Sequence, residues 1–320
     1  MLNWLNTYRR YACDINRINQ EAARSPEDLV LTVEKIFRSD LRQITERILS
    51  IPVRRHIIFL SGPSSSGKTT CAKKLAEEFE NSGSKAIMIS MDDFYLGAEM
   101  VERLPNGKPD FESVNALDID LMRQCVAEIA ACGECDIPRY DFGNSRRRED
   151  KHHIRLEDDS VVIIEGIHAL NPIFGDIIPK EYLSRIYIGV KQGIKDNEDY
   201  VLHNREVRLL RRLVRDSRFR ETPPEKVLDM WDEVVDGETR YIRPYRYTSD
   251  FTVNTIHIYE PCVMKRHAVP LLRSIGEDSS YYDQAQHLIR ELGRFADIDE
   301  SLVPENSLLR EFFGGGIYEY

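Results

Sequence analysis

The segment Gly62–Thr69, which reads GPSSSGKT, fits the pattern G-x-x-x-x-G-K-[ST]. It follows the apolar run His56–Ser61 and precedes Thr69–Glu80, whose apolar residues recur at helical spacing. In this context the glycines let the backbone fold around phosphate oxygens, while backbone N–H groups and the helix N-terminus face the anion. The chain is therefore expected to build a strand–loop–helix unit for a nucleoside triphosphate. The motif alone does not separate a kinase from a switch or a motor.

The residue types of this loop have different expected tasks. The loop residues expected to bind the nucleotide are Gly62, Ser64, Ser65, Ser66, Gly67, Lys68, Thr69 and Thr70. Lys68 would pair with the β- and γ-phosphates, and the Thr69 hydroxyl would bind Mg²⁺. A nucleoside triphosphate and Mg²⁺ are therefore the expected ligands of this loop.

The chain alternates short apolar runs with amphipathic stretches. The runs expected to be strands lie at 56–61, 85–90, 161–165, 185–190 and 250–254. The stretches expected to be helices among them lie at 69–80, 118–131 and 205–218. Such alternation is typical of a parallel sheet with helices on both faces. We predict an α/β fold of the P-loop NTPase type, with three layers and a mostly parallel sheet.

Helical additions are predicted at both ends of this region. Ser25-Pro26-Glu27-Asp28 has the sequence of a helix start. An apolar stripe at three- and four-residue spacing follows it and consists of Val30, Val33, Phe37, Leu41, Ile44 and Ile48. We predict a helical segment over 1–54, a phosphate-loop domain over 55–256 with a lid around 205–225, and a helical C-terminal extension over 257–320 packed on that domain.

Composition limits the class of protein. With 320 residues, 42% hydrophobic and 31% charged, the chain can bury a core. No apolar run approaches the roughly 20 residues that cross a bilayer, and the N-terminus lacks the apolar region of a secretory signal. Six cysteines do not make a disulfide scaffold, so a cytoplasmic protein with reduced thiols is expected. The net charge of −10 argues against general nucleic-acid binding.

A basic cluster needs its own explanation, because residues 205–220 contain seven arginines. Four of them follow at three- and four-residue spacing and would share one helix face: Arg208, Arg211, Arg212 and Arg215. Such a face is self-repelling unless anions lie against it, and phosphate groups suit guanidinium donors. A solvated face and a nucleic-acid contact are the alternatives, and the net charge disfavours the second.

Five motifs resemble, in the same order, the uridine kinase and phosphoribulokinase family of P-loop kinases. They are GPSSSGKTT at 62–70, SMDDFY at 90–95, PRYDF at 138–142, VVIIEGIHAL at 161–170 and RLLRRLVRD at 208–216. Five ordered motifs are a more specific signal than any single one. VPENSLLREFFGGG at 303–316 also resembles the end of bacterial uridine-kinase-like nucleoside kinases, whose longer members carry threonyl-tRNA-synthetase-like N-terminal modules.

The resemblance implies a catalytic role for Asp92, which would accept the proton of the attacking hydroxyl. Its neighbour Asp93 is the competing acid and would instead cap a turn or face solvent. Three cations would stabilise charge on the transferred phosphoryl group, namely Lys68, Arg211 and Arg215. Arg212 would contact ATP.

The resemblance also places Glu165 with Thr69 on the metal side of the site. The alternative is that the Glu165 carboxylate pairs with a buried Lys or Arg.

The residues that the resemblance assigns to the acceptor are Asp92, Tyr95, Glu112, Tyr140 and Arg208. Tyr140 would stack on a nucleobase, unless it is a core tyrosine, and Glu112 would hold ribose hydroxyls. Two departures leave the nucleobase open. The family's His-Pro-Asp is replaced by Ser113-Val114-Asn115, and residues 143–146 lack the His that pyrimidine-selective members carry there.

The predicted function is Mg²⁺-requiring, ATP-dependent phosphorylation of a small metabolite. A nucleoside 5′-hydroxyl is the leading acceptor, with uridine or cytidine first. The alternatives are a same-fold kinase for a purine nucleoside, a sugar or a pantothenate-like alcohol, and a catalytically weak nucleotide-binding regulator. A pure switch would need neither a hydroxyl base nor a second group of anion-binding arginines. No nucleic acid and no membrane is an expected partner, and a homo-oligomer is left open because this family often assembles.

Overall fold

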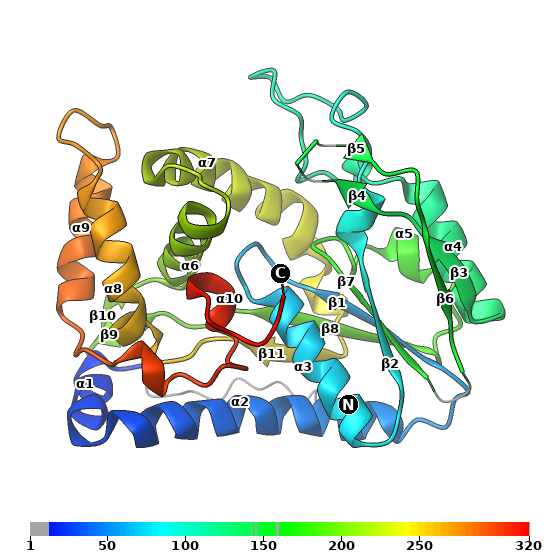
Figure 1. The fold of residues 1–320 in the computed structure, drawn as a ribbon, viewed down its shortest axis with the longest axis horizontal. Coiled ribbons are helices and arrows are strands. Elements are labelled where there is room, and N and C mark those ends of the chain that lie inside the picture. Colours follow the sequence, from blue (N-terminus) through cyan, green and yellow to red (C-terminus); the bar gives the residue numbers. More distant parts are fainter. Residues whose placement is uncertain (1–12, 142, 145, 158–159, 320) are drawn as a thin grey trace.

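The computed structural model describes residues 13–319 apart from residues 142, 145, 158 and 159. A five-stranded sheet forms the middle of the molecule (Figure 1). In spatial order its strands are β11 (Phe251–Asn254), β8 (Leu183–Gly189), β1 (His56–Ser61), β7 (Val161–Glu165) and β2 (Ala86–Ser90). Every neighbouring pair is parallel. All five predicted strands are present, and the α/β prediction is confirmed.

The central strands end together at one edge of the sheet. All residues of β1 and β7 are buried, as apolar strands covered on both faces should be. Leu60 of β1 and Ser90 of β2 both lie opposite Glu165 of β7. The chain after β1 and the 3₁₀ turn η1 (Met91–Phe94) after β2 therefore meet at the carboxyl edge, where α/β sheets bind ligands.

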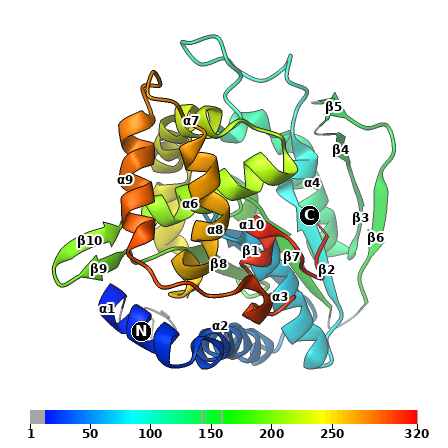
Figure 2. The same cartoon turned by 60° about the vertical axis from the view of Figure 1, so that its left-hand side comes forward.

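Helices cover both faces of the sheet and complete three layers (Figures 1 and 2). Alternate residues of β1 belong to two separate apolar clusters, because successive side chains of a strand point to opposite faces. The first cluster includes residues of α1 (Ile15–Arg24), α2 (Pro26–Leu49), α3 (Lys68–Asn81), α6 (Asn204–Phe219), α8 (Glu260–Arg273) and α9 (Tyr282–Gly293). The second includes residues of α4 (Ile119–Ala131) and α5 (Pro172–Gly175).

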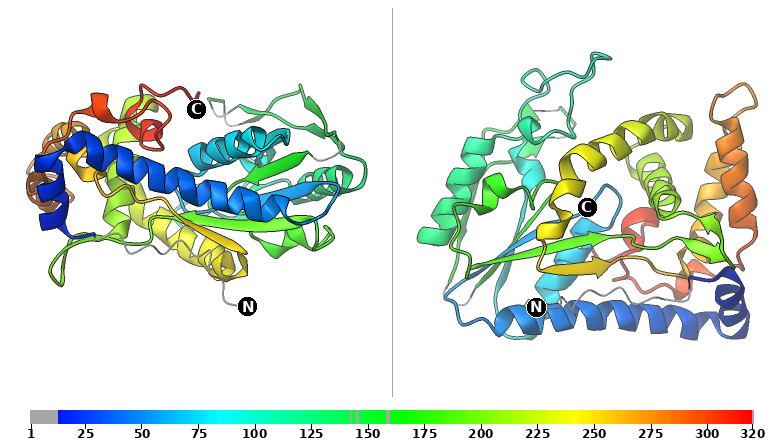
Figure 3. Two further views of the ribbon diagram at one scale, coloured as in Figure 1. Left: turned by 90° about the horizontal axis from the view of Figure 1, so that it is seen from below. Right: turned by 180° about the vertical axis from the view of Figure 1, so that it is seen from behind.

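The predicted N-terminal helix start is confirmed. Ser25 accepts a hydrogen bond from the Asp28 backbone N–H, and Pro26 is the first residue of α2. The predicted apolar stripe is buried along the whole helix. Figure 3 shows α2 crossing one side of the molecule, where it packs against α3. The first part of the predicted segment, residues 1–12, lies outside the described residues.

Several elements were absent from the sequence prediction. Three two-stranded sheets consist of β3 (Glu134–Ile137) with β6 (His152–Arg155), β4 (Tyr140–Asp141) with β5 (Arg146–Arg147), and β9 (Ile194–Asp196) with β10 (Asp199–Leu202). Each of these six strands contains charged residues, so none of them forms the apolar run by which the central strands were predicted. The region after α6 is also helical, in α7 (Pro224–Gly237), η3 (Glu238–Ile242) and η4 (Arg243–Thr248). A further short turn, η2 (Val114–Ala116), precedes α4.

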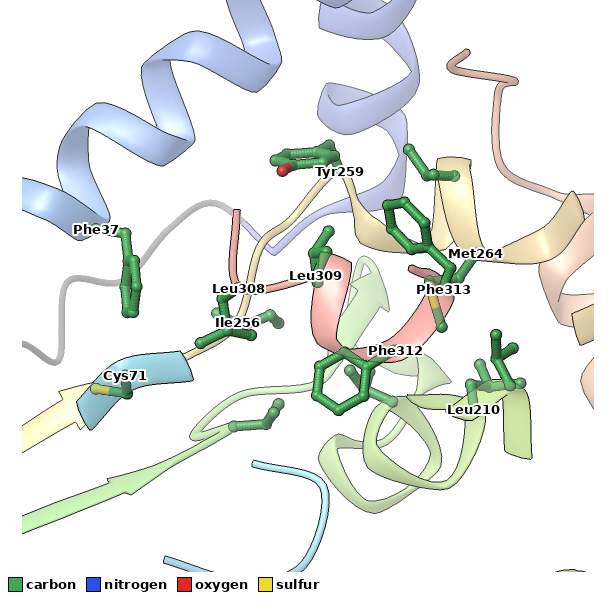
Figure 4. Close-up of a cluster of buried hydrophobic side chains, with 14 of the residues drawn as sticks. Phe37, Cys71, Leu210, Ile256, Tyr259, Met264, Leu308, Leu309, Phe312 and Phe313 are labelled. Carbon is green, nitrogen blue, oxygen red and sulfur yellow. The ribbon is translucent and has the colours of Figure 1, made fainter. Parts of the chain in front are cut away.

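The C-terminal segment is packed deeply into the molecule. After η5 (Glu300–Leu302), the chain forms the short helix α10 (Arg310–Phe313). Leu308, Leu309, Phe312 and Phe313 are each at most 1% exposed. Figure 4 shows them among side chains of α2, α3, α6 and α8. Burying four such side chains contributes about 6–12 kcal/mol.

Within the part of the chain that the structure describes, no helix combines the length and the apolar character needed to cross a membrane.

Candidate active site at the carboxyl edge of the sheet

The phosphate loop runs from the end of β1 to the start of α3. Gly67 is the N-cap of α3 and has a φ of +85°, which favours glycine. Gly62 lies against the neighbouring strand, since a Cβ atom there would come within 2.5 Å of the Ile188 carbonyl oxygen. Ser65 also adopts a positive φ, of 57°. The two glycines are therefore needed for the shape of the loop, as the motif predicted.

The loop carries polar groups that suit an anion. Among the described residues, the buried hydroxyls of Ser65 and Ser66 have no hydrogen-bond partner. The Lys68 Nζ donates to the Pro63 carbonyl oxygen over 3.3 Å, so it is folded back along the loop. Burial lowers the pKa of Lys68, and the charges of Glu165 and Asp92 oppose this change. Buried hydroxyls beside a lysine and a helix N-terminus fit the phosphates of a nucleotide.

Asp92 lies in η1, directly after β2, and its backbone N–H donates to the Ser90 hydroxyl. Burial raises the pKa of Asp92, whereas the charge of Lys68 lowers it. Asp93 points elsewhere: its Oδ1 accepts a hydrogen bond of 3.2 Å from the Tyr140 backbone N–H. The expectation that Asp93 caps a turn or faces solvent was therefore incomplete, because this carboxylate attaches β4 to η1.

Glu165 is the last residue of β7 and is 6% exposed. It accepts a hydrogen bond of 3.0 Å from the Ser90 hydroxyl. Burial, followed by the charge of Asp92, raises the pKa of Glu165 to about 7. The charge of Lys68, which is also buried, opposes this rise.

The oxygens of Thr69 and Glu165 are the hard ligands that Mg²⁺ prefers. Thr69 is in the first turn of α3, at the same sheet edge as Glu165. The described residues contain no group of three His, Cys, Asp or Glu side chains arranged to hold a metal. A magnesium ion here would therefore need phosphate or water oxygens as further ligands, which is usual for Mg²⁺.

Two arginines of α6 touch the phosphate loop directly. The Arg208 Nε donates to the Ser64 carbonyl oxygen, and the Arg212 Nη1 donates to the Ser64 hydroxyl, both over 2.9 Å. Arg208 also pairs with Glu238 at 2.7 Å. The arginine face therefore lies over the loop, where it can meet phosphate.

A carboxylate of the same helix holds three arginines together. Asp216 lies 3.3 Å from Arg212, 2.8 Å from Arg215 and 3.5 Å from Arg220. The repulsion expected among these cations is therefore partly relieved by the protein itself. The spacing of Arg212 and Asp216, i and i+4, was a signal that could have revealed this pair.

The prediction that Arg211 shares this face was wrong. Arg211 is fully buried; its Nη2 donates to the Thr255 carbonyl oxygen and pairs with Glu260 at 2.5 Å. Its guanidinium also lies over the Phe312 ring. Arg211 and Arg212 differ by about 100° around the helix, so one turns into the core while the other reaches the loop. Spacing alone could not distinguish the two sides of so broad a basic face.

The predicted acceptor residue Glu112 lines a cavity of about 540 Å³ together with Arg212, Asp110, Phe111 and Tyr241. Burial raises the pKa of Glu112 to about 7, and the charges of Arg212 and Lys68 oppose that rise.

Two neighbours constrain Glu112. A Cβ atom on Gly237 would come within 2.6 Å of the Glu112 Cβ, so α7 approaches it through a glycine. The buried ring of His168 lies against the backbone of Glu112 and Ser113, and burial lowers its pKa to about 4.

Tyr95 and Tyr140 form a separate aromatic group with Phe111. The Tyr95 ring is 5.7 Å from Phe111 and 5.9 Å from Tyr140, and its hydroxyl donates to the Phe111 carbonyl oxygen. Neither tyrosine, although both are described, lines the cavity next to Glu112. The two tyrosines thus support the loop that carries Glu112.

One site contact has no local sequence signal. Glu311 of α10 accepts hydrogen bonds from both the backbone N–H and the hydroxyl of Thr70. Because the two residues are 241 positions apart, only the tertiary structure reveals this contact.

The larger part of the chain is similar in sequence to known proteins. Residues 57–258 match the Phosphoribulokinase / Uridine kinase family. The uridine kinase of Saccharomyces cerevisiae is 30% identical over 198 residues, which are 61% of this chain and 36% of the yeast protein. The uridine kinase of Macrococcus caseolyticus is 28% identical over 199 residues, which are 62% of this chain and 86% of that protein. The solved phosphoribulokinase from Rhodobacter spheroides aligns with 61% of this chain and 68% of its own, at 17% identity and a TM-score of 0.43.

The matched region contains the phosphate loop, the acid after β2, the acid that ends β7 and the arginine helix. This chain belongs to the Phosphoribulokinase / Uridine kinase family.

Proposed function

We propose that the chain is a kinase that transfers the γ-phosphoryl group of ATP to a hydroxyl of a small alcohol. Membership of the family supports this reaction class. The observation that carries the proposal is that Lys68, Asp92 and Glu165 lie at one edge of the sheet. There the Ser90 hydroxyl donates to the Glu165 carboxylate and accepts from the Asp92 backbone N–H. A lysine on the phosphate loop and two acids are the groups that phosphoryl transfer requires.

In the proposed reaction, Asp92 orients the acceptor hydroxyl and takes its proton as the oxygen attacks phosphorus. Lys68, Arg212 and Arg215 neutralise the negative charge that spreads over the transferred group. Thr69 and Glu165 would hold Mg²⁺, which supplies further positive charge to the phosphates when it is bound. The residues thus act by position and electrostatics.

We propose a nucleoside as the acceptor, with its 5′-hydroxyl directed at Asp92. The relatives named as uridine kinases favour uridine among the nucleosides. The cavity of about 540 Å³ has the volume of a small-molecule site. The Glu112 carboxylate at its wall can accept hydrogen bonds from two neighbouring sugar hydroxyls.

The test is ADP release from ATP and Mg²⁺ with a panel of nucleosides, sugars and pantothenate. We expect turnover with a pyrimidine nucleoside and a loss of kcat of about 10²–10⁴ in Asp92→Asn, with the dissociation constant for ATP changed less than threefold. Asp93→Asn is the matched control, since its amide oxygen can still accept the Tyr140 N–H, and it should keep kcat within about threefold.

The possible outcomes separate the alternatives. Turnover with only a purine nucleoside, a sugar or pantothenate would contradict the proposed pyrimidine nucleoside acceptor but would support the proposed kinase activity. ATP binding without turnover on any acceptor would favour a nucleotide-binding regulator. Normal turnover by Asp92→Asn would remove Asp92 from its proposed role.

A further inference from the structure

The first turn of α3, directly after the phosphate loop, is hydrogen-bonded to the C-terminal segment through one carboxylate. The Glu311 Oε2 lies 2.5 Å from the Thr70 hydroxyl and 3.3 Å from the Thr70 backbone nitrogen, and both groups donate to it. Thr70 is 0% and Glu311 7% exposed. An acidic side chain therefore occupies two hydrogen-bond donors at the N-terminus of α3.

These donors belong to the part of the helix that binds anions. Because Gly67 is the N-cap, the N–H groups of Lys68, Thr69 and Thr70 have no acceptor within α3, whereas the Cys71 N–H already donates to Gly67. In a phosphate loop such N–H groups bind phosphate oxygens. The Glu311 carboxylate thus takes a position that suits a phosphate.

The charge of Glu311 reaches other groups of the site. Burial lowers the pKa of Lys68 and of Arg220, and the charge of Glu311 acts against that lowering in both. It also adds to the effects of burial and of Asp92 that raise the pKa of Glu165. The same negative charge would repel a phosphate bound at this site.

The backbone around Glu311 is held in place. Leu308, Leu309, Phe312 and Phe313 are fully or almost fully buried (Figure 4). Leu308 lies directly against the Cα of Gly67 in the phosphate loop. Moving this segment would expose all four side chains, whereas rotation of the Glu311 side chain moves only its carboxylate. Any movement that frees Thr70 is therefore a change of rotamer.

We propose that Glu311 lowers the affinity of this site for its phosphate donor by competing with a donor phosphate for Thr70. The inference rests on the proposed function, because it requires a nucleotide on the phosphate loop. In the free protein the carboxylate holds Thr70, and it turns away when the nucleotide binds. The same competition helps ADP to leave after transfer.

The experiment compares dissociation constants for ADP and ATP, with Mg²⁺, by calorimetry. Glu311→Gln keeps an acceptor oxygen for Thr70 and removes the charge, so both nucleotides should bind about tenfold more tightly. The control Glu305→Gln removes the same charge from an exposed position of the same segment. Its dissociation constants for ADP and ATP should lie within twofold of those of wild type. Glu311→Asp shortens the side chain by one methylene and so moves the carboxylate away from Thr70. It should tighten the binding of both nucleotides by less than Glu311→Gln does.

Each result decides between the possibilities. If wild type binds ADP and ATP but folded Glu311→Gln binds them equally or more weakly, Glu311 does not compete with the donor phosphate. The proposed kinase function would be unaffected by that result. If Glu311→Gln does not fold, as judged by circular dichroism, unchanged or weaker binding by Glu311→Asp overturns the competition equally. Failure of wild type and all variants to bind either nucleotide overturns the proposed function and this inference together.

Discussion

Single acidic residues at this site are held in surroundings that disfavour their charge. Glu165 ends an entirely buried strand and accepts a hydrogen bond from the Ser90 hydroxyl, and Glu112 lines a cavity that α7 also borders. Burial raises the pKa of both to about 7. A carboxylate placed like this reduces stability unless a ligand compensates it. Residues of this kind mark functional positions more often than structural ones.

The variant Glu112→Gln tests whether the charged form of this carboxylate destabilises the fold. Because the folded-state pKa is raised, the group favours folding most below its ordinary pKa of 4.5, and this contribution is lost as the pH rises to about 7. At pH 8 the variant should be more stable than wild type by about 1–3 kcal/mol, and at pH 4.5 the two should be nearly equal. Urea unfolding at both pH values measures this.

The control for this measurement is Glu102→Gln, which changes an exposed acid of the same loop. It should alter the free energy of unfolding by less than about 0.5 kcal/mol at either pH. An advantage of Glu112→Gln that is equal at pH 4.5 and pH 8 would contradict the raised pKa.

At the scale of elements, α6 has two different tasks. One side reaches the phosphate loop through Arg208 and Arg212. The other enters the core, where Arg211 pairs with Glu260 of α8. The buried pair fixes α6 against the C-terminal helices, and the loop contacts then follow from the 3.6-residue turn of the helix.

Arg211→Met should therefore destabilise the fold and leave nucleotide binding nearly unchanged in the folded protein. Leaving Glu260 buried without its partner costs about 3–5 kcal/mol, and the double variant Arg211→Met/Glu260→Leu should recover much of this. Arg205→Met, at an exposed position of α6, should change stability by less than about 0.5 kcal/mol. Urea unfolding and ATP titration provide both readouts; a large loss of ATP affinity in folded Arg211→Met would contradict the structural role.

At the scale of the whole molecule, the two ends of the described chain meet at one carboxylate. Glu34 of α2 accepts hydrogen bonds from the Tyr259 hydroxyl, over 2.7 Å, and from Ser307. His257 lies 3.5 Å from it. Burial alone would raise the pKa of Glu34, but the charge of His257 and the hydrogen bonds from Ser307 and Tyr259 lower it to about 2. The N-terminal helix, the chain after β11 and the C-terminal segment are thereby joined.

Glu34→Gln should weaken the fold in a pH-dependent way. Because the folded-state pKa is lowered, the stabilisation is complete above about pH 4.5 and is lost as the pH falls towards 2. The variant should lose about 2–3 kcal/mol at pH 7, and the difference should shrink at pH 3.5. Unfolding of both proteins by urea at the two pH values tests this, with the exposed Glu46→Gln as the control. A difference that does not change with pH would contradict the lowered pKa.

Patterns in the sequence were enough to predict the central sheet, the phosphate loop and the acids at the edge of the sheet. These features are local: β1 and β7 are unbroken apolar runs, and the loop needs glycines and a lysine at fixed spacing. The carboxyl ends of parallel strands must then come together, so the meeting of Lys68, Asp92 and Glu165 followed from the topology. A local sequence pattern is enough to predict a feature whose geometry is set within one strand or one turn.

Three features could be seen only in the folded protein: which side of α6 faces the phosphate loop, what lines the cavity beside Glu112, and how the C-terminal segment reaches Thr70. Arg211 and Arg212 are neighbours of the same residue type, and their different surroundings come from α8 on one side and the loop on the other. Glu311 contacts a residue 241 positions away. Contacts of this kind depend on how whole elements pack, and packing energy is spread over many side chains that no single stretch of sequence contains.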